Sequence, residues 1–360
     1  MHVVSLDKIV SGSKLGKALY SADGRILLGR GVDLTGKYLN RLREMGYYSI
    51  FVSDDFDDEV ELNDVIQDST RKFAIGQVKS LFKSTMEGNG DGNNFNLKNG
   101  IENITDSIIN DITGNDNLMI DLYSLKTHDD YTFQHSVNVC VLAIVLGIKA
   151  GLNGIELREL AKGAMLHDIG KMHTPFEILT KDSLLTDEEY EIVKRHTNEG
   201  FSFLLNDSNV SPKIAIVAYQ HHERFDGTGY PDGIGGDQMH IYSKIVAIID
   251  TYDALTSDRV YRKRYNNDQA LNIIYKESEG KFEPDLLKLL RNCVARYTSG
   301  SLVRLKTGET AIVLRNNASI LNQPIIKLLT DSDGNKIENS PEIDISQNGD
   351  SNNIEIESII

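Results

Sequence analysis

His167-Asp168-Ile169-Gly170-Lys171 is the stretch of sequence around which the rest of the chain is organised. A histidine followed directly by an aspartate offers metal ions a ring nitrogen and a carboxylate that can bridge two of them. Gly170 allows the backbone to turn, and Lys171 places a cation beside the pair. Alone, such a dipeptide is more often a polar pair at a helix end, so its meaning depends on the residues that accompany it.

Further histidines and an aspartate lie at intervals in the same part of the chain, among apolar helical segments. An imidazole or a carboxylate without a partner is costly to bury in such surroundings. A shared metal ion would relieve that cost. The residues are His135, His196, the adjacent pair His221 and His222, and Asp250.

The composition describes a chain that folds into real cores and repels other anions. A length of 360 residues is enough for two or three domains, and a hydrophobic content of 40% supports apolar cores. The formal net charge of -15 opposes general binding to nucleic acids and to anionic membranes. A phosphate-containing substrate must therefore be bound by cations close to the site.

Two cysteines and the absence of a targeting signal indicate a cytoplasmic protein. Cys140 and Cys293 are far apart and form no CxxC pair, which favours reduced structural thiols over a regulatory disulfide. The N-terminal MHVVSLDKIV does not have the pattern of a signal peptide. The longest apolar run, 137–148, is too short to cross a bilayer. We therefore expect no membrane span.

Residues 1–60 favour a small α+β module without a cluster of catalytic residues. Short strand-like runs alternate with turn signals such as Ser-Ala-Asp-Gly at 21–24. Thr35 is placed to cap a helix that is stopped by Gly46, and 49–52 predict a closing strand. Regulation or dimerisation is the expected use of this module, so a homodimer is one expected assembly.

Residues 61–125 predict a helical connector. Its two helical segments are separated by a polar Gly/Asn stretch at 87–94, which cannot hold a helix. The two segments would form either an antiparallel hairpin or a connecting stalk. A domain boundary is expected near residue 125.

Residues 126–297 are predicted to be nearly all helix and to carry the chemistry. A helix beginning near residue 131 carries His135. Another, from about 155 to 166, delivers the His167-Asp168 pair at its C-terminal end. The metal-binding candidates are therefore expected on or beside helices.

The remaining candidates also follow helix signals. Thr186 begins a capping box for a helix that presents His196. Ser211-Pro212 supplies a cap and a first-turn proline for a helix that ends at the His pair. Asp250 interrupts the apolar helix at 241–257, where a carboxylate needs a positive partner.

Residues 298–360 favour a small β module with a flexible acidic and polar tail. The runs 301–305, 310–314 and 325–329 alternate in polarity or are rich in β-branched residues. Asp, Ser, Asn and Glu are prominent from 331 onward. The chain as a whole is expected to be mainly α.

The candidate ligands supply nitrogen and oxygen donors and no thiolate. Seven donors are too many for one tetrahedral zinc, and mixed imidazole and carboxylate sets suit iron, manganese or another octahedral ion. We expect two divalent ions, bridged by Asp168 and by water; such pairs lie about 3.5–4 Å apart and form hydroxide near neutral pH. Phosphate-ester hydrolysis is expected, with redox oxygenation as an alternative. The expected ligands are His135, His167, Asp168, His196, His221, His222 and Asp250.

Three cations and one loop could meet a phosphate substrate. Lys171 lies three residues after Asp168, and Arg259 and Arg262 share a face if their helix continues. Each would otherwise be an ordinary exposed cation. The loop at 222–231 is a tight connection by itself, but its place after the His pair favours a wall of the site.

These motifs resemble the HD-GYP family, a branch of the HD phosphohydrolase superfamily. The resemblance rests on HDIGK at 167–171, HHERFDGTGYP at 221–231 and DTYDALTSDRVYR at 250–262, in the order and spacing of that family. Members are helical bundles with two- or three-metal centres, often of iron or manganese. They hydrolyse the bacterial second messenger cyclic di-GMP to linear pGpG or to GMP. The resemblance implies a helical-bundle catalytic domain with this activity.

The resemblance also implies roles for individual residues. The seven candidates above match metal ligands, and Asp168 and Lys171 match catalytic positions. Where members with three metals have a Glu, four residues before the first His, this chain has Tyr131, which favours two metals. Val260 replaces a proline common between the two arginines. Positions that contact the dinucleotide are matched by Lys171, Tyr230, Arg259 and Arg262.

Two other functions stay open. A receptor could bind the dinucleotide, or a partner protein, without cleaving it; degenerate relatives usually lose His or Asp ligands, and none is lost here. Alternatively, the substrate could be another cyclic dinucleotide or a nucleotide, which the sequence does not exclude.

Overall fold

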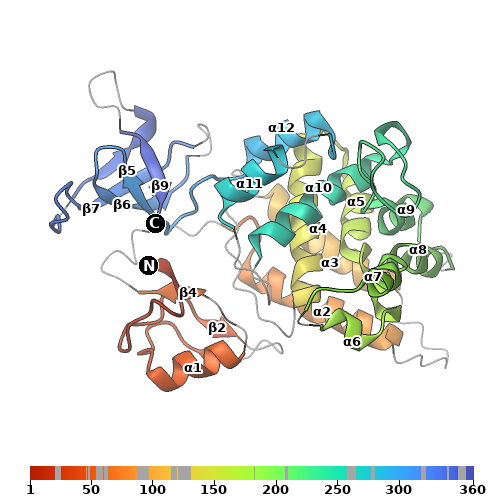
Figure 1. The fold of residues 1–360 in the computed structure, drawn as a ribbon, viewed down its shortest axis with the longest axis horizontal. Coiled ribbons are helices and arrows are strands. Elements are labelled where there is room, and N and C mark those ends of the chain that lie inside the picture. Colours follow the sequence, from red (N-terminus) through yellow and green to blue (C-terminus); the bar gives the residue numbers. More distant parts are fainter. Residues whose placement is uncertain are drawn as a thin grey trace. The chain divides into compact units, whose positions relative to one another are not determined.

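The computed structural model places the chain in two compact units, drawn in Figure 1. One unit combines Met1–Val65, Asn117–Tyr131 and Val294–Ile360, and the other combines Ile66–Asp116 and Thr132–Cys293. The predicted division into four segments stays a prediction. The structure describes the chain except for residues 21–25, 46, 48, 54–59, 61–63, 87–96, 115–119, 121–130, 182, 207–209, 258–264, 277–279, 318–321, 339 and 348–353.

The second unit is built from helices, as expected for the part of the chain that carries the motifs (Figure 1). Its described elements are α2 Asp68–Met86, α3 Leu97–Thr113, α4 Tyr131–Lys149, α5 Gly154–Leu166, η1 Ile169–His173, α6 Phe176–Leu179, α7 Asp187–Lys194, α8 His196–Asn206, α9 Pro212–Gln220, η2 Gly236–Gln238, α10 Ile241–Thr256, α11 Asn267–Lys276 and α12 Pro284–Cys293.

Helix α4 forms the centre of this unit. Every residue from Val137 to Leu146 is buried, and all of them except Asn138 are apolar. A helix that is apolar all round belongs in a core. By length and composition, α4 is the one described helix that could cross a membrane, but 72% of the relevant window, Thr132–Lys149, is buried inside the structure. This degree of burial is typical of a core helix.

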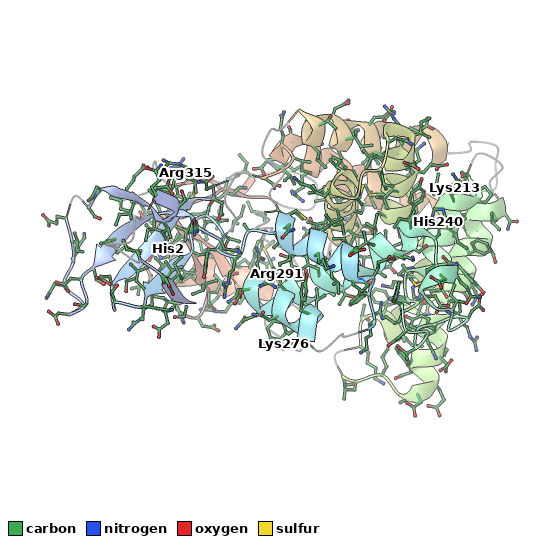
Figure 2. All side chains as sticks on the ribbon, turned by 90° about the horizontal axis from the view of Figure 1, so that it is seen from above. His2, Lys213, His240, Lys276, Arg291 and Arg315 are labelled. Carbon is green, nitrogen blue, oxygen red and sulfur yellow. The ribbon has the colours of Figure 1, made fainter. Side chains whose placement is uncertain are left out.

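The predicted helix starts are formed by the expected side chains. Thr186 accepts a hydrogen bond from the backbone of Glu189 and completes the capping box of α7. Ser211 caps α9 ahead of Pro212. His240, labelled in Figure 2, was not predicted as a cap, but its side chain accepts a hydrogen bond from the backbone of Tyr242 and caps α10. The helix predicted to present His196 is in fact two helices, since α7 ends at Lys194 and α8 begins at His196.

Helices α2 and α3 pack against each other and against the core of the same unit. Lys162 on α5 forms an ion pair with Glu102 on α3 at 2.8 Å, and Arg158 pairs with Asp106 at 2.9 Å. These contacts show a packed helix pair and exclude a free stalk. The polar stretch predicted at 87–94 lies outside the described residues.

The N-terminal part of the first unit is the predicted α+β module. Strands β1 and β4 pair antiparallel, as do β2 and β3. Thr35 caps α1, which turns Leu39 and Leu42 into a small apolar core. The turn predicted at 21–24 and Gly46 lie outside the described residues. The elements are β1 His2–Ser5, β2 Leu19–Tyr20, β3 Ile26–Leu28, α1 Gly36–Glu44 and β4 Ser49–Val52.

The C-terminal part is an antiparallel sheet with the strand order β8-β7-β6-β5-β9. The tail expected to be flexible supplies two of these strands. Val303 of β5 pairs with Ile359 of β9, and Ile356 packs against the core of the sheet. The mainly α fold with a small C-terminal β module is confirmed. The elements are β5 Leu302–Leu305, β6 Thr310–Arg315, β7 Ile325–Thr330, β8 Glu342–Asp344, η3 Ile345–Gln347 and β9 Ile356–Ile359.

Candidate metal centre

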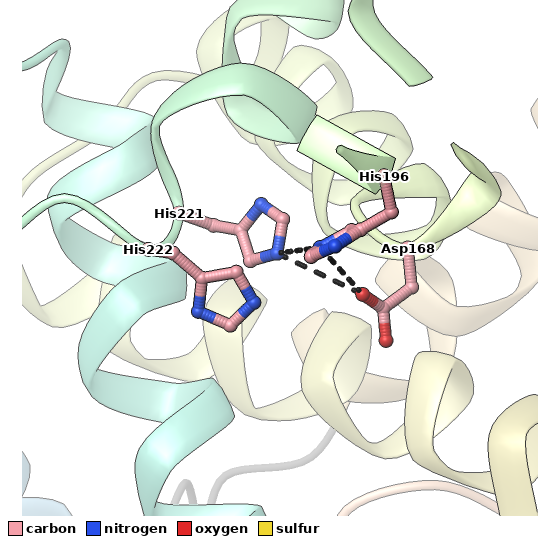
Figure 3. A group of neighbouring side chains, drawn as sticks. All are labelled: Asp168, His196, His221 and His222. Carbon is pink, nitrogen blue, oxygen red and sulfur yellow. Dashed lines mark hydrogen bonds and ion pairs between the residues drawn. The ribbon is translucent and has the colours of Figure 1, made fainter. Parts of the chain in front are cut away.

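The predicted ligands converge from separate helices of the second unit. His167 is the C-cap of α5, and Asp168 follows it at the start of η1. His196 begins α8, and His221 is the C-cap of α9, with His222 next to it. Figure 3 shows Asp168 and the last three histidines facing one another. Most of these side chains therefore extend from helix ends.

The last two candidates, His135 and Asp250, come from within helices. They lie on α4 and α10, respectively, and His135 Nε2 is 3.1 Å from Asp250 Oδ1. Asp250 thus has the positive or hydrogen-bonding partner that its apolar helix requires.

The seven side chains form two neighbouring groups. In each group, one nitrogen or oxygen atom per residue lies within 4.8 Å of the others. The first group is Asp168, His196, His221 and His222; the second is His135, His167 and Asp250.

Asp168 faces both groups, one with each of its oxygens. Its Oδ1 lies 3.5 Å from His196 Nε2 and 3.7 Å from His221 Nε2. Its Oδ2 lies 3.4 Å from His167 Nε2 and 3.9 Å from His135 Nε2. A carboxylate in this position can be shared between two cations, which is the position predicted for Asp168.

Three of the histidine rings are oriented by hydrogen bonds from their outer nitrogen. The Nδ1–H group of His167 donates to Ala164 O at 2.8 Å. His196 donates in the same way to Val193 O at 2.6 Å, and His221 to Ala218 O at 3.0 Å. Carbonyl oxygens only accept, so they fix the tautomer and leave each Nε2 as an acceptor facing inward.

Inward-facing acceptors meet one another in the first group. His196 Nε2 and His221 Nε2 lie 3.3 Å apart, with both ring protons on the far side. Among the described residues, His167 Nε2 and Asp168 Oδ1 are buried and have no hydrogen-bond partner. Burying unpaired acceptors costs free energy, whereas a cation would use all of them as ligands. The residues present therefore fit a divalent metal site.

Gly170 allows η1 to approach α8 closely. A Cβ atom there would lie only 2.0 Å from the carbonyl oxygen of His196 and 2.6 Å from the backbone nitrogen of Gly200. Any other residue would push the two segments apart. The glycine of the HDIGK stretch thus sets the separation between Asp168 and His196.

His135 is held by a residue that the sequence reasoning missed. Its Nδ1 lies 2.7 Å from Asp253 Oδ2, and Asn138 Nδ2 donates to Asp253 Oδ1 at 3.2 Å. Burial lowers the pKa of His135, but hydrogen bonds to Asp250 and Asp253 more than offset this and raise it to about 9. The signal in the sequence was the spacing of Asp250 and Asp253, because residues three apart share a helix face.

Charges around Asp168 keep it ionised. Burial raises the pKa of Asp168, but Lys171 and His167 outweigh this effect and hold it well below its usual value. Lys171 Nζ lies 2.5 Å from Asp168 Oδ2. Burial lowers the pKa of His196 to about 3, although Asp168 opposes the shift, so this ring is neutral near pH 7. A neutral ring and an ionised carboxylate are the forms that bind metals.

The loop after the His pair forms a wall beside the cluster. The Tyr230 ring stacks on His222 with centroids 4.7 Å apart and an interplanar angle of 25°. Gly229 has no room for a side chain, since a Cβ would lie 2.4 Å from the backbone of Glu223. The sequence reasoning had favoured such a wall.

Glu223, which the sequence reasoning also missed, fastens this loop from inside. It is fully buried, and its carboxylate accepts hydrogen bonds from the backbone of Asp232, Gly233 and Ile234 at 2.7, 3.1 and 3.1 Å. An acidic residue directly after the two histidines was the available signal.

Several predicted positions cannot be placed. Arg259, Val260 and Arg262 lie outside the described residues. Tyr131 begins α4, and its side chain is likewise outside the description. The substrate roles of the two arginines stay predictions.

Comparison with known proteins identifies the class to which this site belongs. Residues 118–286 match the family model of the HD domain, and 302–353 match the model of a KOW domain associated with the HD domain. The helical unit therefore carries an HD domain. The HDIGK and HHERFDGTGYP motifs of this domain are similar to those of the HD-GYP branch of that family.

Curated relatives include proteins named for cyclic dinucleotide hydrolysis. The chain is 39% identical over 225 residues to the cyclic di-GMP phosphodiesterase PA4108 of Pseudomonas aeruginosa, covering 62% of this chain and 54% of the relative. It is 32% identical to cyclic di-GMP phosphodiesterase PdeB of Borreliella burgdorferi, covering 57% and 54%. A 3'3'-cGAMP-specific phosphodiesterase of Vibrio cholerae is 34% identical, covering 53% and 44%. The chain thus spans about half the length of these relatives.

A solved structure shares the fold. Bd1817, an HDG"Y"P protein from Bdellovibrio bacteriovorus, superposes with a TM-score of 0.51 at 18% sequence identity, covering 80% of this chain and 97% of that one. At this identity, the likeness concerns the fold alone.

Proposed function

We propose that this protein is a metal-dependent phosphodiesterase that hydrolyses cyclic di-GMP to linear pGpG. The observation that carries the proposal is the set of buried, inward-facing acceptors around Asp168, with each oriented ring donating its proton outward. Relatives named as cyclic di-GMP phosphodiesterases support the choice of substrate.

The proposed ligands are the two groups around Asp168, each holding one divalent ion, iron or manganese. Imidazole and carboxylate donors without thiolate suit these ions. When bound, such a pair supplies a water molecule acidic enough to be hydroxide near neutral pH. Asp168, which faces both groups, would be the ligand that they share.

The chain's own groups orient the substrate. Lys171 offers its ammonium group to a phosphate oxygen from beside Asp168, to which it is paired in the structure. Burial raises the pKa of Tyr230, so its hydroxyl keeps a proton that it can donate to the substrate. Arg259 and Arg262 are proposed as further phosphate or base contacts from their place in the motif alone.

A second cyclic dinucleotide is an alternative substrate. The similarity to a 3'3'-cGAMP-specific phosphodiesterase favours 3'3'-cGAMP as the alternative substrate. Continued hydrolysis of pGpG to GMP is also open to a site of this kind.

A cytoplasmic location is proposed because both cysteines are free and buried. The homodimer stays a prediction.

The test is turnover by protein of known metal content. Protein purified without oxygen and loaded with iron or manganese is assayed with cyclic di-GMP and 3'3'-cGAMP, and products are identified by mass spectrometry. We expect pGpG carrying one oxygen atom from labelled water. Asp168→Asn, checked for folding by circular dichroism, is expected to lose turnover. Verified metal occupancy without any product from either substrate would refute the proposal, and binding without turnover would indicate a receptor.

A further inference from the structure

We infer that Tyr190 and Lys194 form a guanine-binding surface beside the metal centre, an inference that rests on the proposed function. These two residues lie one turn apart on α7 and therefore share a face of that helix. No motif singled them out in the sequence. What connects them to the site is a series of ring contacts that begins at the metal cluster.

The series runs from His222 to Tyr230 and then to Tyr190. Tyr230 stacks on His222 at 4.7 Å, and the Tyr190 ring meets Tyr230 edge to face at 6.4 Å with an angle of 79°. In a cyclic dinucleotide, a base is separated from its phosphate by one ribose. A base at Tyr190 therefore leaves a phosphodiester within reach of the cluster.

Tyr190 has a surface on which a base can stack. Tyr190 is 47% exposed, although its ring is in contact with that of Tyr230. An exposed aromatic ring next to a phosphate-directed site is the usual platform for a nucleobase. The ring is also well anchored, since the capping box and the 2.5 Å ion pair of Lys181 with Glu189 fix the start of α7.

Lys194 supplies the preference for guanine. Its Nζ lies 5.3 Å from the centroid of the Tyr190 ring and 5.7 Å from that of Tyr230. An ion pair with Glu191, whose side chain is 64% exposed, helps to hold it there. An ammonium group donates hydrogen bonds, which suits the O6 and N7 acceptors of guanine, whereas adenine presents an amino donor in place of O6.

A single introduced fluorophore tests the stacking. The chain contains no tryptophan, so Tyr190→Trp places the only one on this surface. We expect cyclic di-GMP to quench its emission to saturation, and cyclic di-AMP to do so only at higher concentration. Tyr38→Trp, on α1 of the other unit, is the matched control, since Tyr38 is 40% exposed, and its emission should not change.

The inference and the proposed function can fail separately. A Tyr190→Trp protein that hydrolyses cyclic di-GMP without any change in emission would refute the guanine-binding surface and leave the function standing. Quenching without hydrolysis by any metal-loaded form would support the surface and refute the enzyme.

Substitution of Lys194 tests the base preference. In Lys194→Met, the ratio of kcat/KM for cyclic di-GMP to that for cyclic di-AMP should fall by about tenfold, mainly through KM. The ratio for cyclic di-GMP against bis(p-nitrophenyl) phosphate, which has no base, should fall similarly. Lys276→Met, an exposed lysine in the last turn of α11 (Figure 2), should keep both ratios. Unchanged ratios in Lys194→Met would overturn the role of Lys194.

Discussion

The Nδ1 atom of His135 lies 2.7 Å from Oδ2 of Asp253, and both side chains are buried. Through this oxygen, Asp253 orients the ring of His135. The other ring nitrogen of His135, Nε2, faces the cluster. A carboxylate behind a metal-binding histidine fixes the ring and increases its basicity. The position of His135 in the proposed site therefore depends on a residue outside the predicted ligand set.

Asp253→Asn should weaken metal binding while leaving the fold intact. The amide keeps the shape of the side chain but loses the charge that stabilises the ring, so we expect manganese affinity to fall by about 10- to 100-fold. Equilibrium dialysis with metal analysis measures the change. Asp237→Asn, at an exposed position of η2, is the control. Equal affinities in the two variants would show that Asp253 does not act through His135.

Glu223→Gln should destabilise the loop beside the cluster. The carboxylate accepts three backbone hydrogen bonds through its two oxygens. In the amide, one of these oxygens becomes a nitrogen that can only donate. We expect the free energy of unfolding to fall by about 1–3 kcal/mol, as measured by urea denaturation. Glu177→Gln, at an exposed position on α6, should have little effect. A stability equal to that of the control would contradict the role of Glu223.

The metal-free protein should be most stable near pH 6.5. Burial lowers the pKa of His196 from 6.5 to about 3, so below pH 6.5 the unfolded chain binds a proton that the folded chain resists, and stability falls. The pKa of His135 is raised to about 9, so its contribution is complete below pH 6.5 and is lost as the pH rises through 9. The midpoint of urea denaturation, measured at each pH with a chelator present, reports the fall in stability on the acidic limb below pH 6.5 and on the basic limb above it.

Variants assign the two limbs of this profile. His196→Gln should flatten the fall in stability between pH 6.5 and 4.5, and His135→Gln should flatten the fall above pH 7. If each variant keeps the slope of the natural protein on its own limb, the buried histidines are not the titrating groups.

The sequence predicted the candidate ligands because each lies in a local pattern. His167 and Asp168 follow a helix signal, and His221 ends a helix that Ser211 begins. Their convergence in the structure agrees with that expectation, while their metal ligation stays a prediction. Asp253 and Glu223 were missed because each acts through another group, Asp253 through His135 on a different helix and Glu223 through the loop backbone at 232–234. Their places in the sequence were suggestive, but these contacts appear only in the folded chain.

Contacts between segments that are distant in the sequence also explain the main error in the fold. The tail beyond residue 331 has a polar composition, and its strand β9 exists because it pairs with β5, which lies far away in the sequence. Pairing of this kind depends on the completed sheet rather than on local propensity. The separation of α7 from α8 at Arg195 also escaped prediction, since no glycine or proline marks it.

Replacing Lys171 should make metal binding more sensitive to acid. Burial alone would raise the pKa of Asp168, and the adjacent Lys171 ammonium is the largest influence that lowers it. In Lys171→Met the pKa of Asp168 should therefore rise, and protons should compete with the metal for its oxygens at a higher pH. Release of manganese, followed by electron paramagnetic resonance as the pH is lowered, should have a higher midpoint than in the natural protein. Lys171→Arg keeps the charge and should restore the midpoint. A midpoint that is equal in all three proteins would mean that Lys171 serves the substrate only, without tuning Asp168.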